Sequence, residues 1–135
     1  MKDVTKSVCS FDKCKELKDL GVKQTSLLYY LKRRGSDKIY LKTKTDADKL
    51  KNSAELSYIC SAFTASEIGE ILVYDGYKEY LPKIQYNYER KSFIAYAFES
   101  GGVNLPHIFK KEGKYETDTR SELLIFLIKK KNGIT

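Results

Sequence analysis

One stretch near the middle of the chain constrains the fold more than any other, residues 63–72, which read FTASEIGEIL. Thr64 followed three residues later by Glu67 is a capping box, in which each side chain bonds the backbone amide of the other residue. Phe63 before the cap and Ile68 four residues after it match the hydrophobic staple at a helix entrance. We therefore predict a short helix after Thr64, which turns the chain between two sheet-forming halves.

A second helix is predicted near the start of the chain, over residues 11–20. Ser10 is a suitable N-cap residue, and Gly21 follows at the position where a left-handed residue ends a helix. Apolar side chains recur every three residues along one side, as an amphipathic helix requires. These residues are Phe11, Cys14, Leu17 and Leu20.

The last helix has the broadest apolar face. We expect a cap at Thr117 or Asp118, a helix from Arg120 to Lys131, and an end before Gly133. Three lysines in its last turn complement the negative end of the helix dipole. The apolar face comprises Leu123, Leu124, Leu127 and Ile128, with Phe126 beside it.

The first predicted hairpin has arms over residues 27–34 and 38–42, joined by a three-residue turn at 35–37. Alternation places Leu27, Tyr29 and Leu31 on one face, and Ile39 and Leu41 can join them in the core. The other face is basic and aromatic, and it is the candidate binding site. Its residues are Tyr30, Lys32, Arg34, Lys38, Tyr40 and Lys42.

A second hairpin is predicted over residues 80–88 and 92–99, with its turn near 89–91 and its exit at the glycines of positions 101 and 102. Residues 57–62 are expected to be a short extended segment. Two stretches are expected to be loops: 43–52, with a helical turn near 47–50, and 103–115. The element order is then α-β-β-α-β-β-α, an α+β fold in which an antiparallel sheet of two hairpins carries helices on one face.

Length and composition limit the class of protein. A chain of 135 residues is expected to form a single domain, residues 1–135. No apolar run approaches the roughly 18 residues that a membrane span needs, so we predict a cytoplasmic protein without a membrane partner. The net charge of +7 is concentrated at the N-terminal side, where residues 1–52 carry 14 basic and 7 acidic residues. Such asymmetry indicates an anionic partner, although a solvated lysine-rich surface fits it as well.

Few residues suit catalysis or metal binding. The one histidine, His107, excludes any mechanism that needs two, and we interpret it as a loop residue. Cys9, Cys14 and Cys60 lack the paired spacing of a zinc site and are expected to be free thiols. No glycine-rich phosphate loop is present. We predict that the protein is not an enzyme and needs neither a metal nor a cofactor.

Three segments carry a resemblance to a group of proteins. They are residues 11–21 (FDKCKELKDLG), 64–72 (TASEIGEIL) and 116–127 (ETDTRSELLIFL). In this order, the chain resembles small uncharacterised proteins from phages, prophages and mobile elements of Bacteroidetes-type bacteria. It departs from their pattern between residues 35 and 60. The resemblance implies an origin in a mobile element and no particular activity.

Two functions remain as hypotheses. The first is an accessory protein that binds a host or phage protein, for example as an inhibitor of a defence factor. Eleven tyrosines favour it, because tyrosine combines a large apolar area with a polar tip at interfaces. The alternative is an accessory protein that binds nucleic acid through the basic, tyrosine-bearing face of the first hairpin. The sequence leaves the oligomeric state open.

Overall fold

The computed structural model describes residues 8–33, 35–43, 45–46, 56–74, 77–98 and 107–133. The chain forms two compact units, Met1–Thr64 and Ala65–Thr135. The expectation of a single domain stays a prediction.

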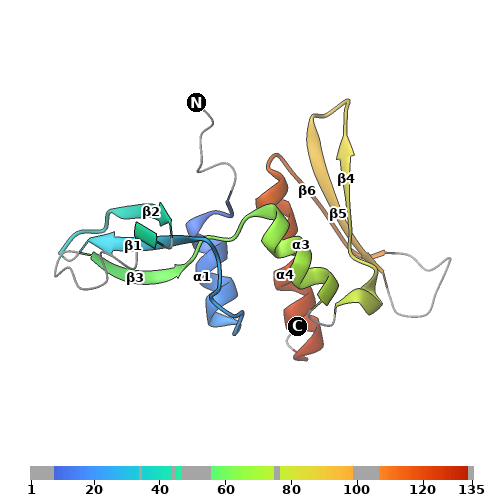
Figure 1. The fold of residues 1–135 in the computed structure, drawn as a ribbon. Helices are drawn as coiled ribbons and strands as arrows, with labels where there is room; N and C mark the ends of the chain where they lie inside the picture. Colours follow the sequence, from blue (N-terminus) through green and yellow to red (C-terminus); the bar gives the residue numbers. More distant parts are fainter. Residues whose placement is uncertain are drawn as a thin grey trace. The chain divides into compact units, whose positions relative to one another are not determined.

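Among its described residues the first unit holds helix α1 (Phe11–Asp19), a short helical piece at residues 45–46 and a three-stranded antiparallel sheet (Figure 1). The strands are β1 (Leu28–Arg33), β2 (Ile39–Thr43) and β3 (Leu56–Ser61). The strand order is β2-β1-β3, so the first strand lies in the centre. Helix α1 contacts β3 and buries Cys14 and Leu17. Gly21 has a φ of 91°, the left-handed conformation predicted for the residue that ends this helix.

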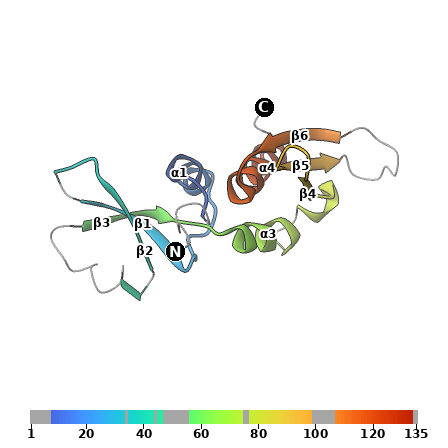
Figure 2. The same cartoon turned by 90° about the horizontal axis from the view of Figure 1, so that it is seen from above.

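The second unit is a meander of three strands with two helices (Figure 2). In chain order its elements are α3 (Ala65–Tyr74), the 3-10 turn η2 (Lys78–Tyr80), β4 (Lys83–Asn87), β5 (Ser92–Phe98), β6 (His107–Gly113) and α4 (Glu116–Lys131). The strand order β4-β5-β6 follows the sequence. Helix α4 packs against β5 and β6, and α3 packs against α4.

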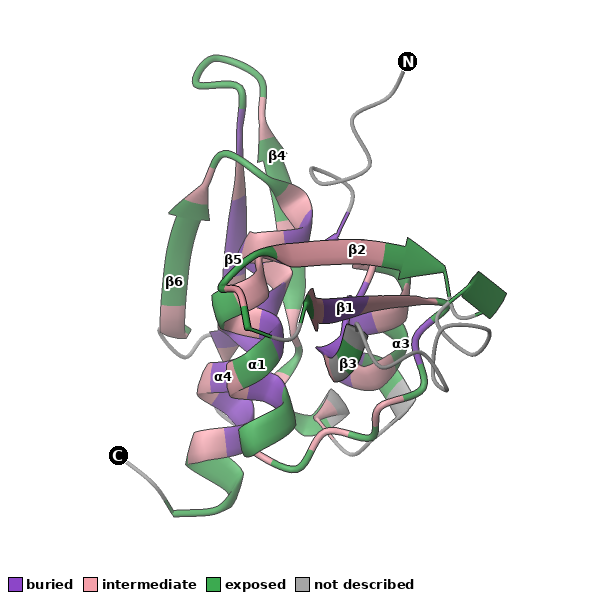
Figure 3. Ribbon diagram, turned by 90° about the vertical axis from the view of Figure 1, so that its left-hand side faces the viewer, coloured by how far each residue is buried: buried purple, intermediate pink, exposed green. Residues whose placement is uncertain are grey.

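Small residues at the centre of this sheet allow α4 to come close. Ala95 and Ala97 of β5 are fully buried, and Figure 3 shows β5 as a largely buried strand between the more exposed β4 and β6. The rings of Phe109 in β6 and Phe126 in α4 stack with centroids 4.8 Å apart. These contacts identify the face of the sheet that is turned toward α4.

The α+β class and all three helices are confirmed, with α3 beginning directly after Thr64. The extended segment predicted at 57–62 is confirmed as β3. Among the described residues each hairpin has a third strand, so the order is α-β-β-β-α-β-β-β-α in two sheets. Residues 107–113, predicted as loop, form β6 instead. The charged residues KKE at 110–112 interrupt the alternation of apolar and polar side chains that predicts a strand. The segment is a strand because it pairs with β5. The predicted helical turn at 47–50 and the glycines at 101 and 102 lie outside the described residues.

Helix α4 starts one turn earlier than predicted, at Glu116, with Tyr115 as the N-cap residue. The hydroxyls of Thr119 and Ser121 donate to the backbone oxygens of Tyr115 and Thr117, each four residues back, at 2.7 Å. The predicted caps, Thr117 and Asp118, therefore lie inside the first turn of the helix. The predicted end is confirmed, because Gly133 follows the helix with a φ of 74°.

The prediction of three free thiols is wrong for two of them. Cys9 and Cys14 form a disulfide, with Cα atoms 6.1 Å apart. Cys9 lies just before α1, and side chains of a helix tilt toward its N-terminus, so the thiol of Cys14 turns back toward it. Cys60 is free and fully buried. The cytoplasmic location stays a prediction.

Candidate nucleic-acid interface

The register of the first hairpin decides which side chains share a face. Tyr30 lies opposite Leu41, and Leu31 lies opposite Tyr40. Directly opposed residues point to the same side of a sheet. The prediction that Tyr30 and Tyr40 share a face with all four basic residues is therefore wrong. Arg34, one of those four, lies outside the described residues.

The length of the connecting loop explains the error. The amide of Arg33 donates to the backbone oxygen of Lys38 at 3.3 Å, so four residues, 34–37, connect the strands. The prediction used a three-residue turn at 35–37. Because side chains alternate with period two, one additional loop residue exchanges the faces of one strand relative to the other.

Tyr30 is a core residue of the first unit. Its side chain is buried, its ring meets the ring of Phe11 edge to face at 5.5 Å, and its hydroxyl donates to the backbone oxygen of Cys9 at 2.6 Å. Lys32 shares this face of β1, and its ammonium lies 3.7 Å from the carboxylate of Asp37. Neither residue belongs to the candidate interface.

The opposite face of the hairpin gathers three of the predicted binding residues together with Arg33 and with Tyr29 and Leu31, which were predicted for the core face. We name it the basic hairpin face, and it comprises Tyr29, Leu31, Arg33, Lys38, Tyr40 and Lys42, of which Leu31 is buried. Lys42 lies directly opposite Tyr29, and the ammonium of Lys38 lies 5.5 Å from the ring centroid of Tyr40. Counting residues 34–37 as the loop would have revealed Tyr29 and Arg33.

The charge of this face is uniformly positive. Arg33, Lys38 and Lys42 are exposed. Within the described part of the hairpin the one acidic residue is Asp37, which pairs with Lys32. Three like charges on one face of the β1–β2 hairpin repel one another, and an anionic ligand would relieve that repulsion.

The residues considered for catalysis belong to different units, the cysteines to the first and His107 to the second. Burial raises the pKa of the Cys60 thiol to about 11, against the opposing charges of Lys18 and Lys15, so it remains protonated at neutral pH. His107 is exposed at the start of β6. Among the described residues, no group of three or more His, Cys, Asp or Glu side chains could hold a metal ion. The prediction that the protein is not an enzyme stays a prediction.

Comparison with known proteins finds no matching family model, no matching curated protein and no matching solved structure. The resemblance to phage and mobile-element proteins thus stays a prediction. Within the described ranges, no helix has the length and apolar character needed to cross a membrane.

Proposed function

We propose that the protein binds nucleic acid through the basic hairpin face. One observation carries the proposal: the corrected register brings three exposed cations and two tyrosines to one side of the β1–β2 hairpin, while Tyr30 anchors the other side in the core. The function predicted as the alternative is thereby favoured, on a partly different set of residues.

The chemistry of the face suits a nucleic-acid backbone. Lysine and arginine neutralise phosphates and release bound counterions, so affinity falls as salt rises. Tyrosine rings beside them can stack on unpaired bases. In this protein the phosphate contacts would come from Arg33, Lys38 and Lys42.

A pair of charge reversals tests the proposal. Lys42→Glu alters the basic hairpin face, whereas Lys32→Glu makes the same charge change on the opposite face of the same hairpin. Binding to random-sequence duplex DNA and RNA is measured by fluorescence anisotropy across a salt series. Lys42→Glu should weaken binding at all sequences and lower the slope of log affinity against log salt by about 0.9 for the lost phosphate contact. Lys32→Glu should do neither.

Two results would contradict the proposal. If the wild-type protein shows no salt-sensitive binding to duplexes at about 50 mM salt, the face is only solvated. If the two reversals weaken binding equally, net charge and not the hairpin face governs the interaction.

A second candidate, the binding of a host or phage protein, is favoured by an aromatic cluster in the second unit. Tyr88 is 83% exposed at the β4–β5 turn. Its ring lies 4.9 Å from that of Tyr86, which lies 4.9 Å from Phe93. Exposed, mutually supported tyrosines are typical of protein-interaction hot spots. Nuclease-treated capture from host lysate should retain a partner with wild type and lose it with Tyr88→Ala.

A further inference from the structure

The face of the β4-β5-β6 sheet that points away from α4 carries a tyrosine with a lysine on each side. Tyr96 lies in the central strand, and the register places Lys83 of β4 directly opposite on one side and Lys110 of β6 directly opposite on the other. All three side chains therefore project from the same face. Phe109 and Ala97 project from the other face, toward α4.

The ring of Tyr96 is held by its neighbours on this face. It lies nearly parallel to the ring of Phe98, with centroids 6.3 Å apart and planes 17° apart. His107 meets it edge to face at 5.9 Å, and the ammonium of Lys110 lies 5.9 Å from its centroid. Tyr96 and Phe98 are partly exposed, and Tyr96 lies beside two cations.

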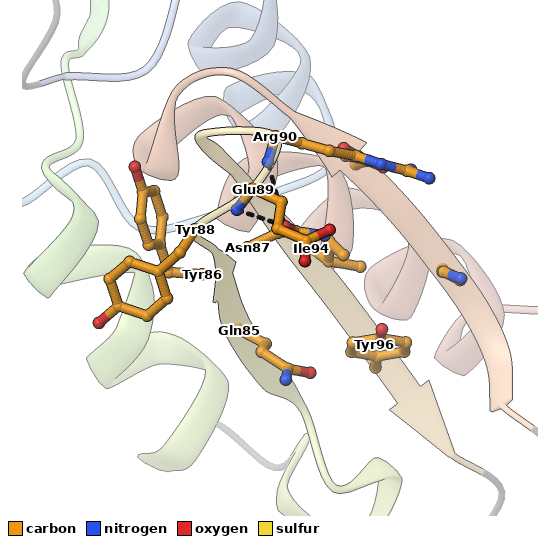
Figure 4. A pocket seen from close by; sticks show the side chains of 10 residues that line it. Gln85, Tyr86, Asn87, Tyr88, Glu89, Arg90, Ile94 and Tyr96 are labelled. Atoms are coloured by element: carbon orange, nitrogen blue, oxygen red, sulfur yellow. Dashed lines mark hydrogen bonds and ion pairs between the residues drawn. The ribbon is translucent and has the colours of Figure 1, made fainter.

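Next to this row the sheet face is hollowed into an open groove of about 580 Å³ (Figure 4). Ile94 forms part of its floor, and Gln85 lies opposite Ile94 with its amide exposed. This volume falls within the roughly 300–1,000 Å³ of ordinary ligand pockets. Gln85 can recognise a base edge, because a primary amide both donates and accepts hydrogen bonds.

Two acidic residues line the groove, Glu89 at the β4–β5 turn and Glu112 of β6, and the charge of Glu112 is compensated by its neighbours. Glu112 accepts a hydrogen bond from the Ser92 hydroxyl at 2.6 Å and pairs with the Arg90 guanidinium at 3.0 Å. The Ser92 hydrogen bond, followed by Arg90, lowers the pKa of this carboxyl. Its charge thus opposes an anionic ligand less than an unpaired carboxylate would. The two residues directly opposite Tyr96, Lys83 and Lys110, are both cations.

We propose that this face binds single-stranded nucleic acid, with bases stacked on Tyr96 and Phe98 and the flanking phosphates at Lys83 and Lys110. Charge complementarity selects this occupant, because cations at both sides of an aromatic strand match the alternation of base and phosphate along a strand. Central-strand aromatics on an open sheet recognise single-stranded RNA in other folds by the same physics. Duplexes are excluded, since their bases are already stacked.

This inference deepens the proposed function and rests on it for the ligand class, but it concerns residues of the second unit only. The two can therefore fail separately. Duplex binding tests the basic hairpin face, and the loss of single-strand binding on substitution of Tyr96 tests the face around Tyr96.

The test uses the full chain with labelled oligo(dT) and oligo(U), and a matched set of variants. Tyr96→Leu keeps apolar bulk but removes the aromatic surface, and Tyr96→Phe keeps the ring. Tyr115→Leu is the control: Tyr115 is a partly exposed tyrosine of the same unit, with the ammonium of Lys114 5.7 Å from its ring centroid, but it lies outside the row. Circular dichroism melts verify that each variant is folded.

Tyr96→Leu should weaken oligonucleotide binding about 5- to 150-fold, the loss expected for one base–aromatic stack. Tyr96→Phe and Tyr115→Leu should bind within about 3-fold of wild type, as expected for changes that leave the stack intact. Replacing Lys83 and Lys110 by Gln should lower the salt slope by about 0.7 for each lost phosphate contact.

Three results would overturn the inference. They are full oligonucleotide binding by folded Tyr96→Leu, equal losses in Tyr96→Leu and Tyr115→Leu, and binding of a mononucleotide as tightly as a strand. If Tyr96→Leu does not fold, the Lys83→Gln/Lys110→Gln variant decides. An unchanged salt slope in that variant would show that the two lysines make no phosphate contacts. Loss of oligo(dT) binding with duplex binding retained would identify the face around Tyr96 as the single-strand site.

Discussion

Both units place a helix against one face of a three-stranded antiparallel sheet, but they hold it by opposite means. In the first unit the large Tyr30 bridges the layers, with its ring against Phe11 of α1 and its hydroxyl on the Cys9 backbone. In the second unit Ala95 and Ala97 are fully buried, and α4 comes close. Truncating the bridging side chain should therefore destabilise the first unit. Enlarging a small, closely packed residue should destabilise the second unit.

The largest effect is expected from truncating the bridge. Tyr30→Ala should lower the free energy of unfolding by about 3–5 kcal/mol, since it empties a packed site and leaves a buried carbonyl unpaired. Tyr40→Ala, on the other face of the same hairpin, should cost no more than about 1 kcal/mol. Urea denaturation measures both. Similar losses would mean that Tyr30 does not bridge the layers.

Enlargement in the second unit should have a smaller effect. A Cβ added at Gly113 of β6 would clash with the hydroxyl oxygen of the buried Thr119 in α4. Gly113→Ala should therefore destabilise by about 1–3 kcal/mol. In the double variant with Thr119→Ala the loss should be less than the sum of the two single losses. Simple additivity would show that the two sites do not touch.

The disulfide gives the smallest of the three effects. Because Cys9 and Cys14 are only five residues apart, a reductant or the Cys9→Ser/Cys14→Ser variant should cost about 2 kcal/mol or less, as loop-closure entropy predicts for a short loop. Cys60→Ala should retain the sensitivity to reductant, because Cys60 is free. Wild-type melts that superimpose with and without reductant would contradict a stabilising disulfide.

Local signals predicted the helices well and the sheets less well. The capping residues around Thr64 and the glycines at 21 and 133 mark real helix boundaries, because caps depend on only a few neighbouring residues. The strand β6 was not predicted because its charged residues do not alternate with apolar ones. Hydrogen bonds to its partner β5 hold it in the extended conformation. With β6 unseen, the row of Lys83, Tyr96 and Lys110 could not be predicted.

By itself, then, the sequence determined the α+β class, the three helices and the strands of both hairpins, through caps and periodicities that act over a few residues. Only the tertiary structure decided which face each hairpin residue occupies, since a four-residue loop exchanges the faces of β2 relative to β1. It likewise decided that the extended segment β3 pairs with β1, that residues 107–113 form β6, and that Tyr30 is buried. These features depend on contacts between residues distant along the chain, which no short window of sequence contains.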